Sequence, residues 1–209
     1  MADLQLRMIE RILAVVACSL REMFPDDFYK RCAYAVSGIL GLLEDEGFTG
    51  EVVGGDFAAF IMSIGADRAG VQGFSFGEEQ CSHFWVEAGG RLIDLGPFFL
   101  PYDSSYPVVA MPALAWDLSS PRPASLRYRE LARFPQSTPL SPDSTVIERG
   151  KTFVRLVRTR YGEQPALKFP TWIVTGRPSL EIAANRGNPW AQGAKKFEAV
   201  AHLNTHLPF

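Results

Sequence analysis

The chain of 209 residues contains few cysteines, almost no net charge and no long apolar run. Its three cysteines, Cys18, Cys32 and Cys81, cannot all pair, and their spacing is not that of a disulfide framework. This indicates a reducing compartment, so we expect a cytoplasmic protein. No apolar stretch approaches the ~20 residues that a membrane span requires. The net charge is −2 and the basic residues are scattered, which argues against nucleic-acid binding.

Several short motifs are also incomplete. The stretch Val15–Cys18 resembles a lipidation motif, but the apolar run before it is too short for a signal peptide. The pairs Gly54-Gly55 and Gly89-Gly90 lack the Lys-Ser/Thr that follows in a phosphate-binding loop, so we interpret them as turn or bulge residues. His202 and His206 lie four residues apart without an evident third ligand, which favours a solvated segment over a metal site.

The composition and length of the chain are ordinary for a globular protein. Hydrophobic residues make up 47% and charged residues 21%, and the length fits one domain over residues 1–209, of α+β type. Periodicity predicts helices over 3–23, from the region of Cys32 to Gly47, over 143–161 and over 189–202. It predicts strands over 51–64, 108–111, 125–128 and 171–175, with a loop or ragged strand over 65–79 and a hairpin over 83–95.

Cys32 is predicted to lie in the first turn or two of a largely buried helix. Pro25, Asp26 and Asp27 provide start signals before it, and Gly47 provides a stop. The unpaired backbone N–H groups and the positive end of the helix dipole favour a thiolate at such a position. The thiolate is the reactive form of cysteine, so this placement suits a nucleophile.

The hairpin brings a histidine and an aspartate within reach of each other. The run from His83 to Glu87 and the run from Arg91 to Leu95 flank Gly89-Gly90, which predicts two antiparallel strands. In such a hairpin His83 falls roughly opposite Asp94 or Leu95, and directly paired side chains lie about 5 Å apart at Cβ. Asp94 can then fix the imidazole tautomer while the other ring nitrogen faces the thiol. We therefore predict a Cys32–His83–Asp94 triad that attacks a carbonyl carbon and needs no cofactor.

These same residues carry a family resemblance. A helix that opens with Cys32, a strand that begins His83-Phe84-Trp85 and a strand that ends in Asp94 resemble the transglutaminase-like branch of the papain-like cysteine enzymes. The chain is also similar to an uncharacterised bacterial family within that fold. The resemblance covers residues 26–97 and implies an antiparallel sheet packed on a central helix that bears the cysteine. It implies a hydrolase or acyltransferase that acts on an amide, ester or thioester of a small-molecule or peptide-like substrate.

The sequence also departs from the family pattern. Papain-like proteases carry a glutamine before the cysteine that helps to bind the oxyanion, and residues 24–31 contain none. Tyr29 or Gln80 is therefore a candidate second donor beside the Cys32 backbone N–H. The Gly-rich approach to the cysteine of arylamine acetyltransferases is also missing from residues 29–31, which disfavours acyl-CoA chemistry.

Other interpretations stay open. Cys32 taken alone fits a small buried apolar residue, His83 a core histidine and Asp94 a turn residue. The first rival is an inactive binding or interaction module that keeps the fold. The second is a zinc-dependent hydrolase in which Cys81 joins the triad residues, although Cys-Ser-His is an unusual ligand pair. Cys81, two residues before His83, is also an alternative nucleophile. Four aromatic residues are candidates to contact substrate or to belong to the core: Trp85, Phe98, Tyr102 and Trp116. The oligomeric state does not follow from the sequence.

Overall fold

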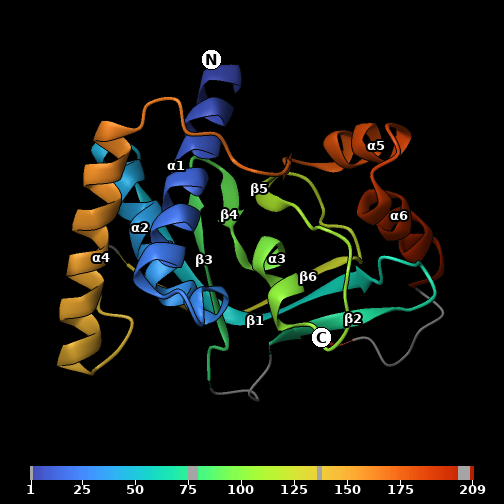
Figure 1. Cartoon of the computed structure of the whole chain (residues 1–209), viewed down its shortest axis with the longest axis horizontal. Coiled ribbons are helices and arrows are strands. Elements are labelled where there is room, and N and C mark those ends of the chain that lie inside the picture. The colour runs from blue at the N-terminus through green and yellow to red at the C-terminus, as the bar shows by residue number, and fades with distance from the viewer. Residues whose placement is uncertain (1, 75–79, 136–137, 202–207) are drawn as a thin grey trace.

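The computed structural model describes residues 2–74, 80–135, 138–201 and 208–209. Within these residues seven strands form one sheet and helices pack against it, which makes a mixed α+β fold (Figure 1). The helices are α1 (Ala2–Met23), α2 (Cys32–Asp45), α3 (Gly96–Phe99), α4 (Ser144–Glu163), α5 (Arg177–Asn185) and α6 (Pro189–Ala201), with 3₁₀ turns η1 (Phe28–Lys30) and η2 (Leu100–Asp103). The strands are β1 (Gly50–Met62), β2 (Ala69–Phe74), β3 (His83–Ala88), β4 (Arg91–Asp94), β5 (Ala113–Asp117), β6 (Leu126–Phe134) and β7 (Ile173–Val174).

The long strand β1 organises the sheet. The strand order is β2-β1-β3-β4-β5-β7, and β6 pairs with β1 as well. All of these pairings are antiparallel except β5 with β7. On one edge of β1, Gly50–Gly55 pair with β3 and Phe57–Met62 pair with β2, while β6 occupies the other edge. The sheet therefore forks beside Asp56, at the point where β3 begins.

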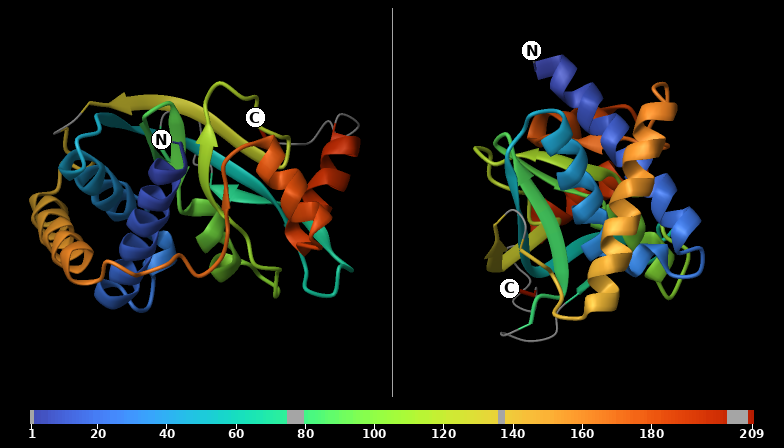
Figure 2. Two further views of the ribbon diagram at one scale, coloured as in Figure 1. Left: turned by 90° about the horizontal axis from the view of Figure 1, so that it is seen from above. Right: turned by 90° about the vertical axis from the view of Figure 1, so that its left-hand side faces the viewer.

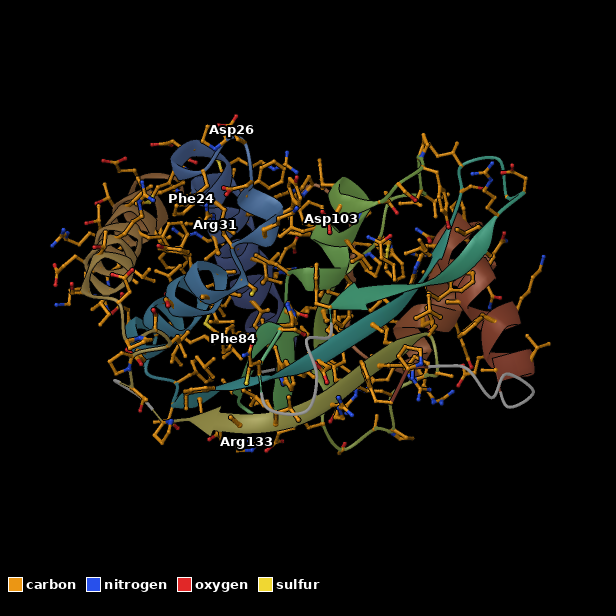
Figure 3. All side chains as sticks on the ribbon, turned by 90° about the horizontal axis from the view of Figure 1, so that it is seen from below. Phe24, Asp26, Arg31, Phe84, Asp103 and Arg133 are labelled. Atoms are coloured by element: carbon orange, nitrogen blue, oxygen red, sulfur yellow. The ribbon has the colours of Figure 1, made fainter. Side chains whose placement is uncertain are left out.

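Alternating side chains separate two hydrophobic cores. Val86 and Ile93 belong to a core with α1, α2 and α4, whereas Trp85 and Leu92, their strand neighbours, belong to a core with α5 and α6. This is the two-residue period of a sheet that is covered on both faces. Figure 2 shows α1, α2 and α4 gathered at one end of the molecule and α5 and α6 at the other. Figure 3 shows Phe84 on the side of the sheet toward α2, where it packs on the first of these cores.

Most of the predicted elements are present. The predicted helices correspond to α1, α2, α4 and α6, with residue 202 outside the described part, and Asp143 caps α4 by accepting a hydrogen bond from the Thr145 N–H. The predicted break in β1 is also present, as a shift of its register with β6 between Gly54 and Gly55. The Val15–Cys18 motif lies inside α1, where Val15 is fully buried. Among the described residues, no helix combines the length and the apolar character needed to cross a bilayer.

The proline-rich middle and the C-terminal part differ from the prediction. The strand predicted over 108–111 is wrong, because Val108 makes only an isolated bridge with Ser63 and the strand lies at Ala113–Asp117. Helix α5 was not predicted, since a helix of nine residues offers too short a stretch for its periodicity to stand out. Of the segment 65–79, residues 69–74 form β2 and residues 75–79 lie outside the described part.

Candidate active site

Cys32 is the first residue of α2. The helix is anchored by a broad buried face that includes Ala35, Val36 and Ile39, and this anchoring fixes where its first turn lies. The preceding residue, Arg31, provides no side-chain cap, because its guanidinium pairs with Asp27. The N–H groups of the first turn are therefore not covered by a capping side chain, and the half-buried thiol lies at the positive end of the helix dipole.

His83 is the first residue of β3 and is 2% exposed. Its Nε2 lies 2.8 Å from Asp94 Oδ2, so the predicted hydrogen bond is present. The predicted register is wrong, however, because Val86 pairs with Ile93, and continuing this register sets His83 level with Gly96. The bond to Asp94 is therefore diagonal across the hairpin. Since Nε2 is engaged by Asp94, Nδ1 is the nitrogen left to face a partner.

Gly96 makes room for this diagonal contact. A Cβ at residue 96 would lie 2.7 Å from His83 Cε1 and 2.9 Å from Asp94 Oδ2. The Gly96 N–H also donates a hydrogen bond of 2.7 Å to Asp94 Oδ1, which fixes the carboxylate from its other side. The turn after β4 thus orients Asp94 and leaves space for the imidazole ring.

Tyr128 provides a third hydrogen bond to Asp94. Its hydroxyl, from β6, donates to Asp94 Oδ2 over 2.7 Å. Burial raises the pKa of Tyr128 well above 10, and the neighbouring Asp94 charge raises it further, so the phenol stays protonated as a donor. Sequence reasoning missed this residue. A tyrosine on a predicted strand far along the chain gives no signal of its contact with Asp94.

Cys32 and His83 line the same cavity, and Cys32 affects the pKa of His83. Burial lowers the pKa of His83, but the Asp94 carboxylate, a hydrogen bond with Cys32 and the charge of the thiolate outweigh burial and raise this pKa to about 10. The imidazole is therefore cationic at neutral pH, and Asp94 accepts its Nε2 hydrogen bond. A thiolate–imidazolium pair, oriented by a carboxylate, is the arrangement that activates a cysteine nucleophile.

The fork in the sheet holds the start of β3 in place. Ser82, the residue before His83, donates its hydroxyl to the Phe74 carbonyl over 2.5 Å and lies 3.2 Å from Asp56 Oδ1. Asp56 is fully buried, and the Arg129 side chain pairs with its other oxygen, with Nε at 2.8 Å. This network joins β1, β2, β3 and β6 immediately beside the histidine, so the sheet fixes His83 through its backbone.

A cavity of about 310 Å³ opens onto the three residues. It is lined by Tyr29, Lys30, Cys32, Ala35, Phe74, Ser82, His83, Asp94, Leu95, Gly96, Phe99 and Asp103. Figure 3 labels Asp103 on η2 and Arg31 next to η1, the two segments that border this cavity. Larger cavities, of about 690, 700 and 590 Å³, lie elsewhere and contain none of the three triad residues.

Of the other candidate site residues, some line the cavity and others do not. Tyr29 lines the cavity, whereas Gln80 is exposed and is not part of its lining. Trp85, Phe98 and Trp116 are 2%, 6% and 0% exposed and pack in the two cores. The expectation that they contact substrate is therefore wrong, and they are core residues. Tyr102 is 49% exposed and does not line the cavity.

Cys81 does not line the cavity that the triad residues share. Its Sγ and the Phe84 ring both lie against Gly54, and Phe84 is on the face of β3 opposite to His83. The pKa of the Cys81 thiol is raised by burial and by the nearby Asp56 charge, which disfavours the thiolate that metal binding requires. In the described ranges, no three His, Cys, Asp or Glu side chains are grouped as metal ligands. The zinc alternative has no support from this arrangement.

Comparison with family models, curated proteins and solved structures finds no match for this chain. What the protein does must therefore be inferred from the geometry of its site.

Proposed function

We propose that the protein is a cysteine-nucleophile hydrolase or acyltransferase that acts on an amide, ester or thioester carbonyl. The observation that carries the proposal is that Cys32, His83 and Asp94 line one cavity, with His83 hydrogen-bonded to Asp94. Cys32 is the nucleophile, His83 the acid and base, and Asp94 orients His83. Tyr128 is a positioning residue, because it acts through Asp94.

The reaction proceeds in two halves. The thiolate adds to the carbonyl carbon, and the carbonyl π electrons move to oxygen to form a tetrahedral oxyanion. The oxyanion collapses, the bond to the leaving group breaks, and the leaving group takes the His83 proton, which leaves an acyl thioester on Cys32. Neutral His83 then accepts a proton from water or an amine as it attacks the thioester. This releases the acid or amide and restores the thiolate. Proton transfer by a positioned histidine contributes typically ~10²–10⁴ in rate.

The start of α2 is the proposed oxyanion site. The Cys32 backbone N–H belongs to the uncapped first turn of the helix, and an oxyanion beside it gains from the helix dipole. Tyr29 is the candidate second donor because it lines the same cavity. Replacement of Tyr29 by Phe tests this role, since loss of one oxyanion donor lowers the rate constant of acylation by about 10²–10³.

The proposal extends to the fold. A cysteine at the mouth of a helix, packed on antiparallel strands that supply histidine and then aspartate, is the arrangement expected of a papain-like or transglutaminase-like domain. The order of the three residues along the chain and the diagonal bond between β3 and β4 support it.

An activated ester tests the proposed chemistry. Incubation with p-nitrophenyl acetate is expected to release nitrophenolate in a burst and to leave an acetyl group on Cys32, located by peptide mass spectrometry. The Cys32→Ala and His83→Gln variants are expected to give no burst. Cys18 and Cys81 serve as internal controls in the same digest. A folded wild-type protein that remains unacylated at Cys32 would contradict the proposal and favour the inactive binding module.

A further inference from the structure

The cavity beside Cys32 changes in character from its rim to its floor. Lys30 and Asp103 at the rim are exposed. Ala35, Leu95 and Phe99, which also line the cavity, are 5%, 1% and 4% exposed. The buried part of the cavity thus includes apolar side chains, whereas the charged Lys30 and Asp103 lie where the cavity meets solvent.

The charges at the rim neutralise each other. Lys30 Nζ lies 3.2 Å from Asp103 Oδ1, and this contact with Asp103 raises the pKa of Lys30. Beyond the triad residues Cys32, His83 and Asp94, Lys30 and Asp103 are the only side chains with formal charge at neutral pH that line the cavity in the described part of the chain. A charged substrate group that enters the cavity would find no unpaired charge of opposite sign.

From these observations, and resting on the proposed function, we propose that the cavity is an acyl pocket for a small, uncharged, apolar acyl group. Aliphatic acyl groups of a few carbons and a benzoyl group are the chemical class that fits, because about 310 Å³ is at the small end of ligand cavities. The acyl chain lies toward Ala35, Leu95 and Phe99, and the leaving group departs past Lys30 and Asp103.

A series of p-nitrophenyl esters measures this preference in the unmodified protein. The rate constant for acylation of Cys32 by each ester is divided by the rate constant for acylation of a free thiol by the same ester. This division removes the differences in intrinsic reactivity among the esters. Each methylene group that is buried is expected to raise the normalised rate about fourfold, hence about fifteenfold from acetyl to butanoyl. The monosuccinyl ester, which is of similar length to the butanoyl ester but anionic, is expected to react at least about tenfold more slowly than butanoyl, because its carboxylate must lose water without gaining a partner.

Two alanines of α2 give a matched pair of variants. Ala35 lies one turn after Cys32 on the same helix face and lines the acyl pocket, whereas Ala33 lines a different cavity between α2 and α4. Ala35→Leu fills the pocket, so it is expected to remove the fifteenfold gain for butanoyl. Ala33→Leu is expected to retain it. If Ala35→Leu does not fold, the ester series on the wild-type protein decides alone.

The outcomes separate the two proposals. Equal normalised rates for acetyl and butanoyl, or a monosuccinyl ester as fast as butanoyl, overturn the acyl pocket and leave the proposed function intact. If no ester acylates Cys32, the proposed function fails, and protection of Cys32 from iodoacetamide by benzamide then tests the cavity separately. If benzamide protects Cys32 in Ala33→Leu but not in Ala35→Leu, the cavity is an apolar ligand site. If benzamide does not protect Cys32 in the wild-type protein, this site is overturned.

Discussion

The site geometry predicts that Cys32 is alkylated fast at slightly acidic pH. The pKa of His83 is raised to about 10, so at pH 6.5 a cationic imidazole lies beside Cys32 and would favour an ionised thiol there. An ordinary thiol with a pKa of about 8.5 is about 1% ionised at that pH. A fully ionised thiol is therefore up to about 100-fold more reactive, an advantage partly offset because a stabilised thiolate is a weaker nucleophile. We expect Cys32 to react about 10–100-fold faster than exposed Cys18.

The assay uses limiting iodoacetamide at pH 6.5 and pH 8.5, with the extent of labelling of each cysteine read by peptide mass spectrometry. The advantage of Cys32 over Cys18 is expected to shrink at pH 8.5, where an ordinary thiol is itself about half ionised. His83→Gln removes the cation and is expected to bring the ratio at pH 6.5 close to one, with circular dichroism as the check that the variant is folded. A ratio near one in the wild-type protein, or an unchanged ratio in folded His83→Gln, would refute the reasoning.

Three further predictions follow from the same group of contacts. Tyr128→Phe removes one donor from Asp94 and is expected to lower the free energy of unfolding by about 1–3 kcal/mol in urea denaturation, with a smaller labelling advantage at pH 6.5; unchanged values for both would exclude a role for the hydroxyl. Gly96→Ala sets a Cβ 2.7 Å from the His83 ring and is expected to abolish the labelling advantage, so a retained advantage would show that the ring is not held there. Because the pKa of His83 is raised from 6.5 to about 10, its stabilising contribution is complete below pH 6.5 and lost as the pH rises through about 10; urea denaturation between pH 6 and pH 10 should show this decline, and His83→Gln should decline less.

The local parts of the site could be predicted from the sequence. Cys32 at the head of a helix follows from start signals and an apolar face in adjacent residues, and the hairpin follows from Gly89-Gly90 between two β-prone runs. Its register could not be predicted to the residue, because the turn allows more than one alignment and the choice depends on packing. Val86 pairs with Ile93, which moves His83 past Asp94 to the level of Gly96.

The parts that depend on distant contacts could not be predicted. Tyr128 reaches Asp94 because β6 pairs with β1, and no short-range pattern specifies that pairing. The same is true of buried Asp56, whose partner Arg129 comes from the same strand as Tyr128. In a sequence, an aspartate after two glycines predicts only a turn or a bulge. Its full burial becomes intelligible once the fork of β1 is known.

The position of Cys32 at the very first residue of α2 has a consequence for how this protein tolerates change. A helix advances by about 100° per residue, so one inserted residue between Cys32 and the buried Val36 would swing the sulfur around the axis and away from the imidazole. The core would hold the remainder of the helix fixed while this happened. The proposed chemistry therefore constrains the spacing of these few residues as well as the identity of the cysteine.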